Sequence, residues 1–376
     1  MTEPVRFEVE TEPRCPVVIG AGALGEVAAI AARHSRSLVV SDATVANLHA
    51  ARLAVGTAAL HVVATGERAK SFAQLEKLLE AMAAARLDRA SLVIALGGGS
   101  VGDVAGLAAA LYMRGIAVLQ CPTTLLAMAD SSIGGKTAID VAAGKNLVGA
   151  FHQPIGVLAD TSTLATLPAA ELASGFGEVV KCALLAGERE LALVEQSAAR
   201  LVAREEAALA QAVELCARLK ARIVAADPRE RGERKLLNLG HTFAHAIEKV
   251  AGYGTIPHGV AVGCGVALAC DASAHGGHLA DARLPARVRA LLAALGLYGS
   301  LAELEARYAR KLDHALLLDA MRLDKKSAAG ELRLVLPSAP GDVRYGIATP
   351  ESELLRALAA HDRAPHHASG FTATRP

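Results

Sequence analysis

Two short apolar segments that run directly into glycine-rich turns constrain the fold of this chain most. Residues 16–19 lead into the sequence GAGALG at 20–25 and then an Ala-rich run, and residues 91–96 lead into GGGSVG at 97–102. A buried strand followed by a glycine-rich turn and a helix is typical of the dinucleotide-binding fold, in which the start of the helix faces a pyrophosphate. The sequence therefore predicts an α/β, Rossmann-like N-terminal domain with two candidate phosphate-binding turns.

An acidic residue after the next strand favours the first of these turns on spacing alone. The apolar segment 37–40 ends at Asp42, at the distance where this fold places the carboxylate that binds a ribose. The second turn has no acid some twenty residues further on. Residues 5–11 alternate like an edge strand, and residues 117–121 predict another strand.

The length of 376 residues predicts two domains, because it exceeds what one ordinary core supports. Strand signals become sparse after about Pro168, and Ala/Leu/Glu/Arg-rich helical patterns continue to about residue 330. We expect an α/β domain at 1–166, a mainly α-helical domain at 167–360, and a disordered tail at 361–376.

Composition argues against several classes of partner. Lys and Arg total 39 against 38 Asp and Glu, so no strong field of one sign attracts nucleic acid or an anionic membrane. Aromatic residues make up 3% of the chain and Trp is absent, so platforms for stacking bases are missing. The six cysteines form no C-x-x-C pair, the N-terminus lacks a leader pattern, and the apolar run 259–270 is too short to cross a bilayer. These features predict a cytoplasmic protein with reduced thiols.

Three histidines form the chemical centre of the sequence. His241 and His245 stand four apart in a helical pattern, so they share one face, and His258 follows on the next segment. This spacing nominates His241 and His245 for a divalent metal, although a histidine on an amphipathic helix is as often a packing residue.

Charged residues elsewhere suggest a polar cleft. Residues 130–146 are Gly-rich and weakly periodic, which favours a loop, and Asp130 occupies the position where a P-loop would need glycine. Lys220 lies on an apolar helix stripe, where a buried ammonium requires an anionic partner. Glu178 and Lys181 share a helix face, for which an ordinary surface ion pair is the simplest interpretation.

Several collinear motifs resemble those of the 3-dehydroquinate synthase family. They are GGG-x3-D at 97–103, YMRG at 112–115, PTTLL at 122–126, DSS-x-GGKT at 130–137, GKN at 144–146, EVVK at 178–181, R-x3-N-x-GHTF-x-HAIE at 234–248 and DKK at 324–326. The resemblance implies conversion of 3-deoxy-D-arabino-heptulosonate 7-phosphate to 3-dehydroquinate and phosphate in the shikimate pathway. Bound NAD would oxidise the substrate transiently, phosphate would leave by elimination, the ketone would be reduced again, and an intramolecular aldol step would close the ring.

The resemblance also implies a role for each site residue. One zinc or cobalt ion would be held by Glu178, His241 and His258, with His245 on the substrate side. NAD would lie along Asp42, Glu67, Lys70, Gly98, Gly99, Ser100, Asp103, Thr123, Thr124, Asp130, Lys136, Lys145, Thr166, Leu167 and Glu171. The substrate and catalysis would use Asp130, Lys136, Lys145, Asn146, Lys181, Lys220, Glu230, Arg234, Asn238, His245 and Lys325 or Lys326. Arg114 would come from the neighbouring copy of a homodimer.

Two departures from the family pattern leave alternatives open. Val260 stands where glutamate is usual, and Pro228 interrupts an acidic stretch. A sister sugar phosphate cyclase remains an alternative, as do an NAD- and metal-dependent polyol dehydrogenase and a catalytically inactive paralogue. The polyol dehydrogenase would release NADH and has no need of so many cations directed at phosphate.

Overall fold

The chain forms two compact units. The computed structural model describes residues 3–56, 58–324 and 332–361. The first unit contains the chain up to Pro168 together with Leu209–Arg229, and the second contains Ala169–Ala208 and the chain from Glu230 onwards. The chain therefore leaves the first unit, returns to it for one helix, and leaves again. The division into domains at 1–166 and 167–360 stays a prediction.

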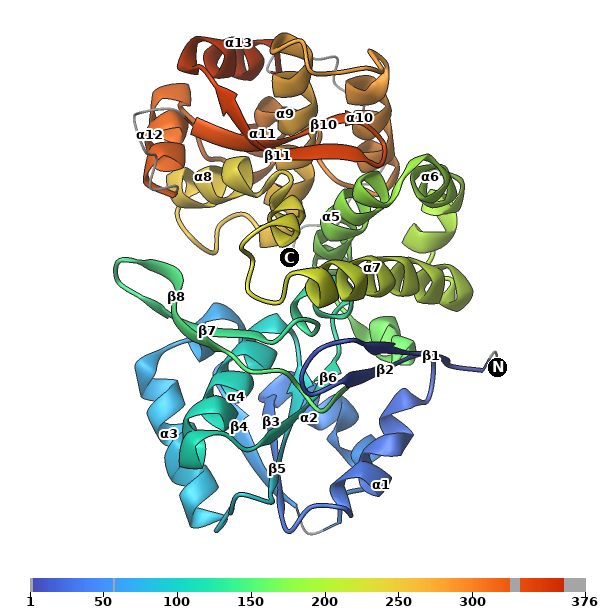
Figure 1. Cartoon of the computed structure of the whole chain (residues 1–376), viewed down its shortest axis with the longest axis vertical. Coiled ribbons are helices and arrows are strands. Elements are labelled where there is room, and N and C mark those ends of the chain that lie inside the picture. Colours follow the sequence, from blue (N-terminus) through green and yellow to red (C-terminus); the bar gives the residue numbers. More distant parts are fainter. Residues whose placement is uncertain (1–2, 57, 325–331, 362–376) are drawn as a thin grey trace. The chain divides into compact units, whose positions relative to one another are not determined.

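A seven-stranded sheet forms the centre of the first unit (Figure 1). Its order is β1 (Val5–Val9), β2 (Cys15–Ile19), β9 (Gly156–Ala159), β6 (Ala117–Pro122), β5 (Leu92–Gly97), β3 (Ser37–Asp42) and β4 (Ala59–Val63). Every neighbouring pair is parallel except β1 with β2. The five strands expected from apolar runs are all present, and the predicted α/β fold class is confirmed. Parallel strands end at one edge, which concentrates the residues that follow them.

The two faces of this sheet bury alternate residues of the same strands. Val93 and Ala95 of β5 pack in one cluster with helices α3 (Phe72–Ala84) and α4 (Gly99–Leu111). Leu92, Ile94 and Leu96 pack in another, with α1 (Val27–Ala31). Because side chains of a strand alternate between faces, an uninterrupted apolar run marks a strand covered on both sides. The shorter α2 (Ala43–His49) follows β3, and α7 (Glu206–Ala226) returns to this unit from later in the chain.

The segment expected to be a loop between Asp130 and Asn146 is largely ordered structure, so that prediction is wrong. Asp130 lies in a single π-helical turn, η5 (Ala127–Ser131), and β7 (Lys136–Val141) pairs antiparallel with β8 (Gly144–Phe151). Helix α4 packs closely on β7, because a Cβ at Gly106 would lie 2.5 Å from Thr137 Cγ2. Glycines in the helix thus allow a polar hairpin to pack against it.

The second unit is mainly helical, as predicted. Its helices are α5 (Ala169–Ala186), α6 (Glu188–Val202), α8 (His241–Ala251), α9 (His258–His275), α10 (Leu284–Ala294), α11 (Leu301–Tyr308), α12 (His314–Asp324) and α13 (Glu351–His361). Helix α9 is buried from Gly259 to Ser273, as expected for a helix that is apolar all round. A hairpin of β10 (Leu332–Ala339) and β11 (Asp342–Thr349) packs against α9 (Figure 1). This hairpin was not predicted from the sequence.

Other sequence expectations can be compared with the described residues. All six cysteines are buried and free. Among the described helices, none is long and apolar enough to span a membrane. The predicted tail at 361–376 lies outside the described residues apart from His361, as do Lys325 and Lys326.

Candidate active site

Three helices of the second unit bring one carboxylate and two imidazoles together. Glu178 lies on α5, and His241 and His258 are the first residues of α8 and α9. Glu178 Oε1 lies 3.6 Å from His241 Nε2 and 3.8 Å from His258 Nε2. A tetrahedral zinc ion with bonds of about 2.0–2.1 Å holds its ligand atoms roughly 3.4 Å apart. The donor set and its spacing fit one divalent ion with a position left for a substrate.

Glycines allow these helices to approach closely enough for the three side chains to meet. A Cβ at Gly177 would lie 1.8 Å from the carbonyl oxygen of Gly259, and one at Gly259 would lie 1.8 Å from the carbonyl oxygen of Ser174. Likewise, a Cβ at Gly265 would lie 2.3 Å from the carbonyl oxygen of Gly240. Glu178, His241 and His258 are each next to one of these glycines in sequence, so close backbone contact between helices sets the spacing of the three side chains.

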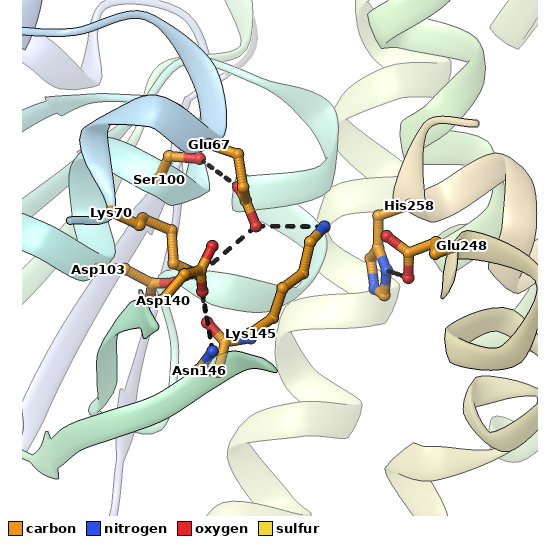
Figure 2. A network of polar contacts seen from close by, with 9 residues as sticks. All are labelled: Glu67, Lys70, Ser100, Asp103, Asp140, Lys145, Asn146, Glu248 and His258. Carbon is orange, nitrogen blue, oxygen red and sulfur yellow. Dashed lines mark hydrogen bonds and ion pairs between the residues drawn. The ribbon is translucent and has the colours of Figure 1, made fainter. Parts of the chain in front are cut away.

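Hydrogen bonds orient both imidazoles. His258 Nδ1 lies 3.0 Å from Glu248 Oε2, a carboxylate that is 2% exposed (Figure 2), and His241 Nδ1 lies 3.2 Å from the carbonyl oxygen of Leu239. A ring that donates through Nδ1 presents the lone pair of Nε2, which is the arrangement found around metal-binding histidines. The buried Lys181 ammonium lies 2.5 Å from Glu178 Oε2, which leaves Oε1 facing the imidazoles. The surface ion pair expected for Glu178 and Lys181 is therefore wrong, because both side chains are 1% exposed.

His245 lies close to this group. Its ring centroid is 5.6 Å from that of His241 and 6.1 Å from that of His258. His245, Glu248 and His258 form a second set of candidate ligands. However, the 3.0 Å contact between Glu248 and His258 Nδ1 is a hydrogen bond, so Glu248 already orients the His258 ring. The assignment of His245 to the substrate side stays a prediction.

In the first unit, residues that follow parallel strands gather at one edge of the sheet. Helix α4 starts at Gly99 directly after β5, and Gly98 precedes it in extended conformation. A Cβ at Gly99 would lie 2.9 Å from Ser131 Oγ, and one at Gly98 would lie 3.1 Å from Thr124 Cγ2. Glycine at both positions lets the start of α4 lie close to Ser131 and Thr124, and the amides at a helix start are the groups that bind a pyrophosphate in this kind of fold.

The first glycine-rich turn, at residues 20–25, contacts a buried carboxylate of the protein. The carboxylate of Asp160 is fully buried, accepts a hydrogen bond from the Leu24 amide at 3.2 Å, and pairs with Arg52 at 2.8 Å. The Leu24 amide, which a dinucleotide-binding turn would use to bind a phosphate, thus donates to a carboxylate of the protein itself. Asp42, its presumed ribose ligand, caps α2 by accepting hydrogen bonds from the amides of Thr44 and Val45. These contacts favour the second turn.

A network of charges surrounds Lys70, which is 5% exposed (Figure 2). Its ammonium lies 2.8 Å from Asp103 Oδ2 and 3.9 Å from Glu67 Oε1, and it donates to Asn146 Oδ1. Burial opposes the charged form of Lys70, yet the carboxylates of Asp103 and Glu67 outweigh it and raise the pKa of Lys70. Burial likewise opposes the charge on Glu67, but Lys70 and Lys145 lower the pKa of Glu67. Ser100 adds a hydrogen bond of 3.0 Å to Glu67.

Lys220 is buried on α7, as its apolar stripe predicted, and its anionic partner is Asp130 of the same unit. The ammonium lies 2.9 Å from Asp130 Oδ1 and 2.5 Å from the Asp130 carbonyl oxygen. Asp130 is in the π-helical turn η5, a feature often found at functional sites. Two residues ninety positions apart therefore form one charged group.

The remaining predicted residues occupy varied positions. Glu230 accepts a hydrogen bond from Asn238 at 2.6 Å, and Arg234, one turn before Asn238, is 1% exposed. Thr123 and Thr124 follow β6, at the edge of the sheet where α4 begins after β5. The others stand at exposed or element-terminal positions: Lys136 at the start of β7, Arg114 in the turn η4 (Tyr112–Arg114), Thr166 and Leu167 at the end of η6 (Thr161–Thr166), and Glu171 in the first turn of α5.

Three residues that the structure brings into these groups were not predicted from the sequence to have a role. Glu248 orients His258, Ser174 Oγ accepts from the Gly259 amide at 3.1 Å, and Asp140 contacts the Lys70 network. Glu248 stands seven residues after His241, on the same face of α8, so helical spacing could have drawn attention to it. Ser174 and Asp140 act through tertiary contacts that spacing does not encode.

Comparison with known protein families agrees with this geometry. Residues 60–174 match the model described as 3-dehydroquinate synthase N-terminal, and residues 175–327 match the one described as 3-dehydroquinate synthase C-terminal. The chain belongs to the 3-dehydroquinate synthase family. The resemblance of its motifs is thereby confirmed.

Relatives within the 3-dehydroquinate synthase family match over most of their length. The 3-dehydroquinate synthase of Symbiobacterium thermophilum is 43% identical over 350 residues, which cover 90% of this chain and 95% of the relative. Among solved structures, 2-epi-5-epi-valiolone synthase from Streptomyces hygroscopicus subsp. jinggangensis, with NAD+ and Zn2+ bound, is 30% identical with a TM-score of 0.79, covering 90% of this chain and 94% of that one. A 2-deoxy-scyllo-inosose synthase complexed with carbaglucose-6-phosphate, NAD+ and Co2+ is 23% identical with a TM-score of 0.84, covering 95% of this chain and 100% of that one, and this likeness shows a common fold.

Proposed function

We propose that this protein is a 3-dehydroquinate synthase that converts 3-deoxy-D-arabino-heptulosonate 7-phosphate into 3-dehydroquinate and inorganic phosphate, with NAD and one divalent metal ion. The observation that carries the proposal is the set of Glu178, His241 and His258, whose donor atoms lie close enough together to hold one metal ion. The chain that carries it is 43% identical to a 3-dehydroquinate synthase over 90% of its length. When bound, NAD would accept and return one hydride, and the ion would polarise an oxygen of the substrate.

The protein's own contribution to the metal site is to hold three donor atoms ready. Lys181 neutralises one oxygen of Glu178, and Glu248 and the Leu239 carbonyl fix the two imidazoles with Nε2 facing inwards. Such preorganisation reduces the free energy that the site would otherwise spend on ordering its ligands. We assign zinc or cobalt to this site on the chemistry of its nitrogen and oxygen donors.

For the nucleotide, we assign the pyrophosphate to Gly98 and Gly99 and the ribose and nicotinamide region to the network around Lys70. The side-chain-free start of α4 supports the first assignment. Asp103 and Glu67 support the second, because their carboxylates, held in place by Lys70, can accept hydrogen bonds from ribose hydroxyls. We extend the assignment to the remaining cofactor residues that the family resemblance implies.

Cations suit a substrate that carries both a phosphate and a carboxylate. The family resemblance implies this role for Lys136, Lys145, Lys181, Lys220 and Arg234. Phosphate and carboxylate groups bind such cations through charge-assisted hydrogen bonds, whereas a neutral polyol would gain little from them. Arg forks suit planar oxyanions and lysines act as point charges, which matches the two anionic groups of the substrate.

We further propose a cytoplasmic homodimer. Six buried, free thiols suit a reducing compartment. Arg114, exposed in a turn with positive φ, is the residue that the family resemblance gives to the site of the neighbouring copy. Light scattering of the purified protein, together with Arg114→Ala, tests this assignment: a monomer with full activity would contradict it.

The reaction itself is tested with NAD below the enzyme concentration. We expect many equivalents of heptulosonate phosphate to be consumed with stoichiometric release of phosphate, while absorbance of reduced nicotinamide stays within the bound amount. Steady accumulation of free NADH would support a polyol dehydrogenase instead. Absence of phosphate release with metal and NAD both present would reject the cyclase.

A further inference from the structure

The β7–β8 hairpin contains a bulge at the point where it reaches the Lys70 network. Between two successive ladder pairs, β7 contributes one residue and β8 contributes three. The single residue is Asp140, and the three residues opposite it are Lys145, Asn146 and Leu147. Bulges redirect side chains that a regular ladder would place on the other face of a strand.

Asp140 makes the contacts that hold this bulge. Its Oδ1 accepts a hydrogen bond from the Asn146 amide at 2.8 Å, and its own amide donates to the Lys70 carbonyl oxygen at 2.9 Å. The same Oδ1 lies 4.0 Å from the Lys70 ammonium. Asn146 has a φ of 57°, in the left-handed region that residues other than glycine adopt infrequently. The carboxylate therefore stabilises a backbone conformation that would otherwise be disfavoured.

The bulge presents two side chains to the charged network. Lys145 Nζ lies 3.4 Å from Glu67 Oε1, and Asn146 Oδ1 accepts a hydrogen bond from Lys70 (Figure 2). Leu147, the third bulge residue, is 63% exposed. If β8 relaxed towards regular pairing, the neighbouring residues Lys145 and Asn146 would point to opposite faces of the strand, and at least one of the two contacts would be lost.

We propose that Asp140 is a positioning residue for the nucleotide and substrate site: its carboxylate oxygen holds the β8 bulge so that Lys145 and Asn146 face Glu67 and Lys70. The proposal rests on the proposed function for the identity of the ligands. Asp140 acts through the Asn146 amide, and its charge towards Lys70 is secondary, because Asp103 is the closer carboxylate.

The test compares Asp140→Ala, Asp140→Asn and, as a matched control in the same bulge, Leu147→Ala. Loss of a hydrogen bond to a charged acceptor typically weakens an interaction about tenfold. We expect Asp140→Ala to raise the dissociation constant for NAD and the KM for heptulosonate phosphate about tenfold each. Asp140→Asn keeps an acceptor oxygen and should restore both values close to wild type, and Leu147→Ala should leave both unchanged.

Three outcomes would overturn the proposal. If a folded Asp140→Ala variant binds NAD as tightly as wild type, Asp140 has no positioning role. If Asp140→Asn binds NAD as weakly as Asp140→Ala, the effect is due to the charge of Asp140. Hydrogen exchange of the Asn146 amide in wild type, which needs no variant, should be slow, and a rate typical of exposed turn amides would also refute it. Wild-type protein that binds no NAD at all would instead reject the proposed function.

Discussion

Replacing Gly259 by Ala should dismantle the metal site while leaving the fold largely in place. The new Cβ would lie 1.8 Å from the Ser174 carbonyl oxygen, so α9 would have to move from α5 by about 1.2 Å before the contact reached 3.0 Å. Because α9 carries His258 and α5 carries Glu178, this displacement would act directly on the distance between two ligands.

The displacement can be compared with what a metal site tolerates. Ligand distances in such sites hold to within about 0.2 Å, whereas the required movement is about 1.2 Å. Misplacement of a group by about 1 Å can reduce function about 100-fold, so we expect the metal dissociation constant to rise about 100-fold. Overpacking of this kind costs about 1–3 kcal/mol of unfolding free energy, which a protein of this size can withstand.

The assay is competition for zinc between the purified protein and a chelating dye, with circular dichroism as a measure of folding. Gly263→Ala is the matched control, because it lies on the same helix and its Cβ would meet the ends of two leucine side chains at 3.0 Å and 3.5 Å and the Gly177 Cα at an ordinary contact distance of 3.7 Å. The reasoning is refuted if Gly259→Ala binds zinc as tightly as wild type, or if the control loses as much affinity.

Three further predictions concern the ligands, the nucleotide and pH. His258→Ala should lose stoichiometric metal on dialysis and His245→Ala should retain it, as elemental analysis would show; the opposite pattern contradicts the assignment. Gly99→Ala should weaken NAD binding about tenfold in titrations, whereas Gly22→Ala, with φ of 86° and no atom near its Cβ, should cost about 1–2 kcal/mol of stability and leave affinity unchanged. Burial opposes the charge on Glu67, but two neighbouring ammonium groups outweigh it and lower the pKa of Glu67 below its ordinary value of 4.5. The ionised carboxylate therefore stabilises the folded protein above about pH 4.5, and this stabilisation is lost as the pH falls through the lower pKa of the folded state. The difference in melting temperature between wild type and Glu67→Gln should therefore shrink below about pH 4.5, and a constant difference would contradict the ion pairing.

Local patterns predicted the parts of the fold that depend on local information. The run at β5 is apolar at every position, and this alone indicates a strand covered on both faces. The hairpins β7–β8 and β10–β11 carry no comparable signal, because their stability comes from packing against α4 and α9. Propensity is a weak guide where tertiary contacts decide.

Residue spacing was informative for the site only in part. The pair His241 and His245 attracts attention by helical spacing, yet His258 lies at an equally suitable distance from Glu178 because Gly177 and Gly259 let two helices touch. Spacing within one helix cannot reveal a contact between two helices, and only the family resemblance nominated His258. The apolar neighbours of Lys220 in the sequence, in contrast, did predict its burial. They did not identify Asp130, ninety residues away, as its partner.

The membership of α7 in the first unit has a consequence for synthesis on the ribosome. The sheet is complete in sequence by Ala159, but Lys220 of α7 pairs with Asp130, and Arg218 stacks over Phe7 at 4.7 Å. Residues 169–208 must be made first, which at about 5–20 residues per second takes roughly 2–8 s. During that interval α7 has not been synthesised, so the nascent sheet lacks this helix and Asp130 lacks the Lys220 ammonium. Stalling translation between residues 170 and 205 should therefore yield an N-terminal fragment that is abnormally prone to proteolysis and dependent on chaperones.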